Sequence, residues 1–294
     1  MIMRNVLMVL LFLCSCLASA ESAEYAVVTT PAPVLNTPDF VSVFGGESGR
    51  NLDADRCGQV RALEYIALPG TVVTLLQKLR SGTTDIYQVD TDDYVAPPHV
   101  RLYVDGRFLK FERSMPEPRR PLLPPRDKVV SALKAVTGSS YVWGGNIPKG
   151  VPELAEWFFR DVRINDAGRL TLAGLDCSGL LYHATGGWTP RNTSQLTAYG
   201  KSVTIAGKNP AEVVELLQPL DLIVWNGHVV IVLDRQTAIE SRLACGSPGN
   251  GGVVMTSLLQ RVTEIMRTRR PVNAWPEGKK QQDIFVARRW YPGS

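Results

Sequence analysis

Two residues of this chain have the types and surroundings of a nucleophile and its base. Cys177 stands in Asp176-Cys177-Ser178-Gly179, directly before the apolar, helix-compatible stretch 180–184. The first N–H groups of a helix lack intrahelical acceptors and the helix dipole is positive there, so this position favours thiolate over thiol. Asp176 has a side chain suited to cap the same helix. The pattern predicts a reactive cysteine at a helix start.

The choice of base is narrow, because the chain has only three histidines. His228 lies 51 residues after Cys177, at the head of the apolar stretch 229–233, which predicts a strand. A histidine there can take the thiol proton and later give it to a leaving amine. A satisfied core or surface histidine is the alternative. We interpret His183, on the cysteine's own helix, and His99, in a Pro-Pro-His segment, as structural.

A base histidine usually needs an orienting partner. Glu240 lies twelve residues after His228, and a turn at 234–237 would return it beside the ring on the next strand. Its carboxylate would then fix the ring tautomer and stabilise imidazolium. A solvated surface glutamate is an equally weighted interpretation.

The elements around these residues predict an α+β domain, with helices first and antiparallel strands after them. Helical spacing covers 127–136, with Gly138 as the stop, and 151–162. A strand over 170–175 is expected to lead into Cys177. The other strands are expected at 203–205, 222–225, 229–233 and 284–287.

The preceding residues 21–115 predict a small all-β barrel or sandwich. Strand candidates lie at 25–28, 71–76, 86–89 and 100–104. Turn signals such as Pro69-Gly70, Ser81-Gly82 and Asp105-Gly106 separate them. Five prolines within 116–125 exclude a regular helix, so residues 116–126 are expected to form a stiff linker to a second domain, 127–294.

The N-terminus, residues 1–20, has a positive start, a short apolar core and Ala18-Ser19-Ala20, as a secretory signal peptide does. A bacterial lipoprotein signal, which would anchor the chain to a membrane through a lipidated Cys16, is the second interpretation. Cleavage after Ala20 leaves three cysteines, so at least one thiol is free or pairs outside the chain. A disulfide between Cys57 and Cys245 with Cys177 free is one such arrangement.

The amino-acid composition limits the kinds of partner that are expected. The 294 residues are 45% hydrophobic and 20% charged, as in a folded protein, with a net charge of +4. This weak excess fits an acidic polymer and does not indicate nucleic acid. Arg267 to Arg270 is a basic run, more often a solvated face than a binding patch. No cysteine and histidine spacing suggests a metal site, and no phosphate-binding loop or other cofactor motif is found.

Four motifs in order resemble the NlpC family of papain-like cysteine peptidases of bacterial cell walls, over about residues 127–292. They are Tyr141-Val142-Trp143-Gly144-Gly145, Asp176-Cys177-Ser178-Gly179-Leu180, Pro190-Arg191-Asn192-Thr193-Ser194-Gln195 and Gly227-His228-Val229. The segments 32–35, 68–72 and 93–94 resemble, more weakly, the bacterial SH3-like modules often joined to this family.

The resemblance implies hydrolysis of peptidoglycan stem peptides, often between D-γ-glutamate and diaminopimelate, by an exported protein of the periplasm or cell envelope. Cys177 would be the nucleophile, His228 the base and Glu240 the third polar residue. Tyr141, Asp176, Ser178 and Arg191 would bind substrate, with Asp176 and Ser178 at a free L-alanine amine. No metal or other cofactor is implied.

The chain departs from the family at two places. The third catalytic residue of the family is commonly histidine, whereas this chain has Glu240. The stretch from Gly145 to Asp176 is longer than in many members, and the extra residues would form either a lid over the substrate cleft or additional packing. The alternatives to a peptidase are a wall-binding protein with an inactive peptidase fold and a related amidase or acyltransferase.

Overall fold

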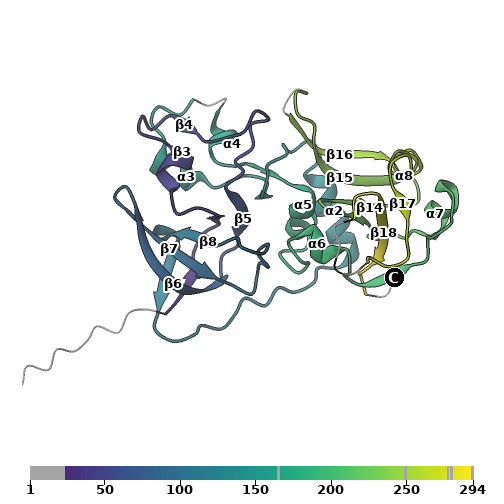
Figure 1. The fold of residues 1–294 in the computed structure, drawn as a ribbon, viewed down its shortest axis with the longest axis horizontal. Coiled ribbons are helices and arrows are strands. Elements are labelled where there is room, and N and C mark those ends of the chain that lie inside the picture. The colour runs from purple at the N-terminus through teal and green to yellow at the C-terminus, as the bar shows by residue number, and fades with distance from the viewer. Residues whose placement is uncertain (1–23, 164–165, 248–249, 277, 279–280, 293–294) are drawn as a thin grey trace, which may run out of the picture.

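The computed structural model describes residues 24–163, 166–247, 250–276, 278 and 281–292, so the predicted signal peptide and Cys16 lie outside the described residues. The chain folds into a β-rich N-terminal half and a mixed C-terminal half, which lie side by side (Figure 1). Helices and antiparallel sheets combine, as the α+β prediction requires. Within the described ranges, no helix is long and apolar enough to cross a membrane.

One seven-stranded antiparallel sheet forms most of the N-terminal half, in the order β5-β2-β8-β7-β6-β1-β9. Gly70 and Gly82 have positive φ values of 86° and 59°, so two of the predicted turns are present. This half is almost all β, as predicted, and its likeness to an SH3 barrel stays a prediction. Its elements are β1 (Tyr25–Val28), β2 (Ala32–Leu35), α1 (Phe40–Val43), β3 (Phe44–Gly45), β4 (Asn51–Leu52), β5 (Leu63–Ala67), β6 (Val72–Ser81), β7 (Thr84–Asp90), β8 (Leu102–Asp105), η1 (Gly106–Phe108) and β9 (Leu109–Glu112).

The proline-rich segment crosses between the halves without helix or strand over 113–125 (Figure 1). Arg119 fixes its middle, since Nη1 donates to Gly186 O at 2.9 Å and Nη2 to the Tyr182 hydroxyl at 3.2 Å. The Tyr291 hydroxyl donates to Pro124 O at 2.9 Å near its end. The segment is therefore bound to the C-terminal half along its course.

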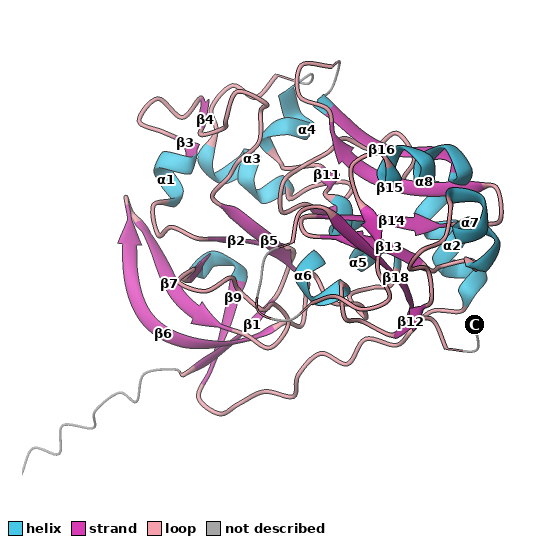
Figure 2. Cartoon of the chain, turned by 45° about the vertical axis from the view of Figure 1, so that its right-hand side comes forward, coloured by secondary structure: helices cyan, strands magenta, loops and turns pink. Residues whose placement is uncertain are grey.

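A second sheet, in the order β12-β18-β13-β14-β15-β16, lies in the C-terminal half (Figure 2), with helices packed on both of its faces. Alternate residues of β13 show this: Leu222 and Val224 pack in the cluster with α2 and α5, whereas Ile223 and Trp225 pack in the cluster with α7 and α8. The elements are α2 (Arg126–Ala135), α5 (Cys177–Ala184), α6 (Thr193–Leu196), β12 (Lys201–Val203), α7 (Pro210–Leu216), β13 (Leu222–Trp225), β14 (His228–Val232), β15 (Thr237–Leu243), β16 (Gly251–Ser257), α8 (Leu258–Met266), β17 (Arg270–Pro271) and β18 (Ile284–Arg289).

The long stretch between Gly145 and Asp176 packs against the N-terminal half. It holds β10 (Asn146–Ile147), α3 (Pro152–Phe158), α4 (Ala167–Leu170) and β11 (Gly174–Leu175). Leu154 is fully buried in the N-terminal core, and the ring of Trp157 lies 4.8 Å from that of Phe108. This arrangement fits the interpretation of the extra stretch as packing rather than as a lid. The core of the N-terminal half therefore includes side chains that follow the linker in sequence.

Two local predictions in this stretch are wrong. The expected strand over 170–175 is reduced to the two residues of β11, because α4 extends to Leu170 and Leu172 has a φ of 58°, outside the β region. The helix expected over 151–162 ends at Phe158, and Phe159 already has extended backbone. Non-local packing of this stretch on the N-terminal half overrides its local patterns.

Candidate active site

Cys177 is the first residue of α5, as predicted, and its thiol is free. The Asp176 carboxylate caps the helix by accepting a hydrogen bond from Gly179 N at 2.6 Å. A Cβ atom at residue 179 would lie 2.0 Å from Gly145 O, so only glycine allows the helix start to approach the Tyr141-to-Gly145 motif so closely. The N–H of Cys177 lies in the first helical turn, which has no intrahelical acceptor for it.

His228 reaches this helix start from a tight hairpin between β13 and β14, whose two loop residues are Asn226 and Gly227. Gly227 has a φ of 87°, as such a turn requires. The Cys177 thiol donates to Gly227 O at 3.7 Å, which places the sulfur against the residue before His228. The hairpin thus holds the imidazole at the start of α5.

Glu240 lies beside the histidine, as the predicted turn at 234–237 requires. Asp234 Oδ1 accepts from Gln236 N and Thr237 N at 2.9 and 2.8 Å, and β15 then pairs antiparallel with β14. Glu240 Oε2 lies 2.6 Å from His228 Nε2, and the glutamate side chain is fully buried. The surface interpretation of Glu240 is therefore wrong.

The electrostatics of this pair favour imidazolium. Burial lowers the pKa of His228, but hydrogen bonding with the side chains of Cys177 and Glu240 more than offsets it and raises the pKa to about 9. Since Nε2 faces Glu240, Nδ1 is the ring nitrogen that remains for the thiol. Burial raises the pKa of Glu240, whereas His228 and Arg261 lower it more, and the net shift is downward. His228 therefore hydrogen-bonds with the side chains of both Cys177 and Glu240, the arrangement that a nucleophile–base pair with an orienting carboxylate requires.

Tyr141 borders the same site. It is 8% exposed, and its pKa is raised first by burial and then by the nearby Asp176 and Cys177. Its backbone is fixed from two sides, by Gly251 O, which accepts from Tyr141 N at 3.3 Å, and by Gln59 Nε2, which donates to Tyr141 O at 3.5 Å. A protonated hydroxyl next to the sulfur is the result.

Arg191 is buried beside Asp176, and substrate binding by this residue stays a prediction. It is 2% exposed, and its guanidinium holds both Asp176 oxygens, with Nη2–Oδ2 at 2.7 Å and Nη1–Oδ1 at 3.0 Å. It also donates to the Ser178 hydroxyl at 2.9 Å and to Asn146 Oδ1 at 3.2 Å. In this geometry Arg191 fixes the helix start, and the Asp176 carboxylate already has a cation as its partner.

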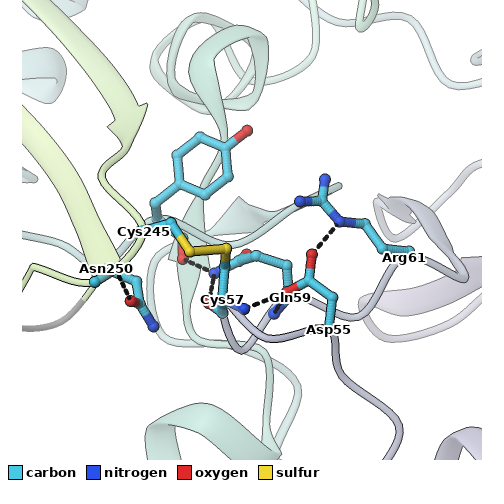
Figure 3. The surroundings of a disulfide bond; sticks show 8 residues. Asp55, Cys57, Gln59, Arg61, Cys245 and Asn250 are labelled. Atoms are coloured by element: carbon cyan, nitrogen blue, oxygen red, sulfur yellow. Dashed lines mark hydrogen bonds and ion pairs between the residues drawn. A yellow bond between two sulfur atoms is a disulfide. The ribbon is translucent and has the colours of Figure 1, made fainter.

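Residues of the N-terminal half contact the Tyr141-to-Gly145 motif beside the site, in keeping with the expectation that a module joined to this family can narrow the peptidase cleft. Figure 3 shows the disulfide between Cys57 and Cys245, which joins residues 188 positions apart. Next to it, Gln59 Oε1 accepts from Trp143 N at 2.8 Å, and the Arg61 guanidinium stacks 4.5 Å from the Trp143 ring. The cysteine count allowed this pairing, but no local signal identifies Gln59 or Arg61.

Two further side chains that surround the triad were also missed. The Trp225 ring lies 4.9 Å from the His228 ring, and Arg261 on α8 forms an ion pair with Glu240. The Asn226-Gly227 pair between two apolar strands was a readable hairpin signal that predicts Trp225 opposite His228. No sequence pattern links Arg261 to Glu240.

The other histidines lie elsewhere. His183 is near the C-terminal end of α5, and burial lowers its pKa; His99 lies in an exposed loop. Among the residues that the structure describes, no group of three or more His, Cys, Asp or Glu side chains could hold a metal ion.

Comparisons with known proteins add little to this geometry. No protein family model matches the chain, and no curated protein matches it. A solved structure of an NlpC/P60 family protein from Bacillus cereus is similar over 94% of this chain and 66% of that protein, at 18% sequence identity and a TM-score of 0.34. This chain therefore spans just under two thirds of that protein. A likeness at this level establishes neither the fold nor the activity of the chain.

Proposed function

We propose that this chain is a cysteine endopeptidase that hydrolyses peptidoglycan stem peptides at the bond between D-γ-glutamate and diaminopimelate. The observation that carries the reaction class is the contact of His228 with both Cys177 and Glu240, the latter at 2.6 Å. The substrate class rests on the four motifs that resemble the NlpC family. Peptidoglycan would then be the partner, and export to the cell envelope the expected location.

The reaction follows from these atoms. The Cys177 thiolate attacks the γ-carbonyl carbon of the glutamyl residue, and the oxyanion that forms can accept from Cys177 N–H. The C–N bond then breaks as His228 gives its proton to the leaving amine, which leaves a thioester on Cys177. His228 next takes a proton from water, and the hydroxide attacks the thioester. The C–S bond breaks and frees the thiolate, and the new carboxylic acid gives its proton to the solvent. Glu240 stabilises the imidazolium throughout.

Substrate recognition would involve both halves. Tyr141 borders the sulfur, and Gln59 and Arg61 bring the N-terminal half to the same motif. An SH3-like module in that position would narrow the site or bind wall peptides. Asp176 and Ser178 are bound to Arg191, so we propose that they position Cys177; a free substrate amine would have to approach a carboxylate that is already paired.

The test is incubation of the purified chain with muropeptides that carry a γ-D-glutamyl-diaminopimelate bond, followed by mass spectrometry of the products. We expect a new amine on diaminopimelate, and no product from Cys177→Ala or His228→Ala. His183→Ala, remote from the site, is the matched control and should cleave normally. Binding without cleavage would favour the inactive wall-binding alternative. Transfer of the acyl group to an added amine in place of hydrolysis would favour the acyltransferase.

A further inference from the structure

We infer that Arg261, on helix α8, is a positioning residue that keeps the buried Glu240 ionised and aligned with His228. Arg261 lies outside all four motifs, on the face of the sheet opposite to α5. The inference rests on the proposed Cys-His-Glu chemistry, and it adds a fourth charged residue to the site.

The contacts are specific. Arg261 Nη2 donates to Glu240 Oε2 at 2.9 Å, and Arg261 Nε lies 2.7 Å from Oε1. Oε2 is also the atom that faces His228 Nε2, so one oxygen is shared between the arginine and the histidine. The contact at Oε2 is a hydrogen bond, whereas the Nε–Oε1 approach is an ion-pair contact without hydrogen-bond geometry, so the arginine holds the carboxylate through one hydrogen bond and through its charge.

Burial makes this ion pair necessary. Glu240 has no exposed surface, and a buried carboxylate without a cation takes up a proton instead of keeping its charge. Arg261 is itself only 15% exposed, so solvent screens the pair weakly. With His228 neutral at the end of an acyl-transfer step, Arg261 is the cation in hydrogen-bond contact with Glu240.

The remaining charged groups around the triad are accounted for. Cys177 approaches His228 from α5, and Tyr141 borders the sulfur. Arg242, on the same strand as Glu240, lies 3.8 Å from Oε1 with a 40% exposed side chain, too far for a hydrogen bond.

The Arg269 guanidinium stacks 4.8 Å from the ring of Trp225, the residue next to the His228 imidazole. Glu264 forms an ion pair with Arg261 at 3.4 Å. None of the groups around the triad duplicates the two-point contact that Arg261 makes with Glu240.

The test measures the chemistry of Cys177 without any substrate. We would follow the rate of alkylation of Cys177 by iodoacetamide against pH in the full chain. In Arg261→Gln the pKa of Glu240 should rise, so the carboxylate stops stabilising the imidazolium at a higher pH. We expect the acid limb of the profile to move up by about one pH unit, which is about a tenfold slower alkylation on that limb.

Three further variants distinguish an effect of the Arg261 charge from an effect of its side-chain packing. Arg261→Lys keeps the cation and should keep the acid limb near that of the wild type. Arg242→Gln removes an equal charge from the same surroundings and should leave the profile unchanged. In Glu240→Gln the carboxylate is gone, so adding Arg261→Gln should shift nothing further.

An unchanged acid limb in folded Arg261→Gln, or an equal shift in Arg242→Gln, would overturn the inference. If Arg261→Gln does not fold, infrared difference spectra between wild type and Glu240→Gln test the inference instead. They report the protonation of Glu240, and we expect it to remain a carboxylate to below its ordinary pKa of 4.5. A protonated carboxyl at neutral pH would also overturn it. Because no peptide is cleaved in these assays, failure of the proposed peptidase activity is a separate result.

Discussion

Replacement of Glu240 by glutamine should lower the pKa of His228 and weaken the thiolate–imidazolium pair. The substitution keeps the size of the side chain and its hydrogen bond to Nε2, and removes only the negative charge. Glu240 Oε2 lies 2.6 Å from the ring in a fully buried site, so this charge acts on His228 with little screening. Its loss should therefore be seen directly in the titration of the ring.

The magnitude follows from the raised pKa. His228 titrates at about 9 instead of 6.5, and a difference of this size corresponds to about 3 kcal/mol of preference for imidazolium. Cys177 and Glu240 share this effect, so Glu240→Gln should lower the pKa by at least about one unit. Because the folded pKa is the higher one, the stabilisation is complete below pH 6.5 and is lost as the pH rises through about 9. The variant should thus be destabilised most at the acid end of this window.

The assay is NMR titration of the imidazole protons, which is simple in a chain with three histidines. His183→Ala and His99→Ala assign the other two signals. Glu264→Gln, which removes a partly exposed carboxylate that contacts Arg261, is the matched control and should leave the pKa of His228 near 9. A wild-type value near 6.5, or an unchanged value in Glu240→Gln, would refute the reasoning.

Three further predictions concern stability. Cys245→Ser, which opens a loop of 188 residues, should lower the free energy of unfolding by up to about 5 kcal/mol in urea denaturation. Asp176→Asn leaves the buried Arg191 without its anion and should cost about 3–5 kcal/mol in the same assay. Leu154→Ala, in the core shared by the two halves, should cost about 2–5 kcal/mol by thermal unfolding, whereas Leu259→Ala, which is 48% exposed, should cost far less.

Controls for the first two variants lie in the chain. Wild type in a reductant should match Cys245→Ser, and a wild type that is equally stable with and without reductant would contradict the role of the disulfide. Asp161→Asn breaks an exposed ion pair with Arg50 and should cost less than about 1 kcal/mol. An Asp176→Asn variant no less stable than Asp161→Asn would show that Arg191 does not depend on the carboxylate.

The parts of the site that sequence predicted are those set by local chemistry. The helix start at Cys177 follows from Asp176 as its cap, and the return of Glu240 beside His228 follows from a short turn and the two-residue period of strands. Helix α2 and strands β13, β14 and β18 were also placed within a few residues, because their apolar patterns are regular.

The failures have a common cause in contacts between distant segments. The strand expected before Cys177 is lost because the preceding stretch packs its leucines on the N-terminal core. The resemblance to the NlpC family implied that Arg191 binds substrate, whereas in the fold its guanidinium is enclosed by Asn146 and Asp176. No local pattern indicates that Arg261, on helix α8, will contact the buried carboxylate of Glu240, on strand β15.

The presence of glutamate at position 240 accounts for the position of Arg261 beside it. In the family that the motifs resemble, the third residue is commonly histidine, which can orient the base as a neutral group and needs no counter-ion. A glutamate at that place must carry its charge to stabilise an imidazolium, and full burial opposes that charge. Arg261 supplies the opposite charge at 2.7 Å and leaves the oxygen that faces His228 in place. A glutamate in this role is therefore chemically sound only together with its arginine, and the two residues should be exchanged together in any attempt to rebuild the site with histidine.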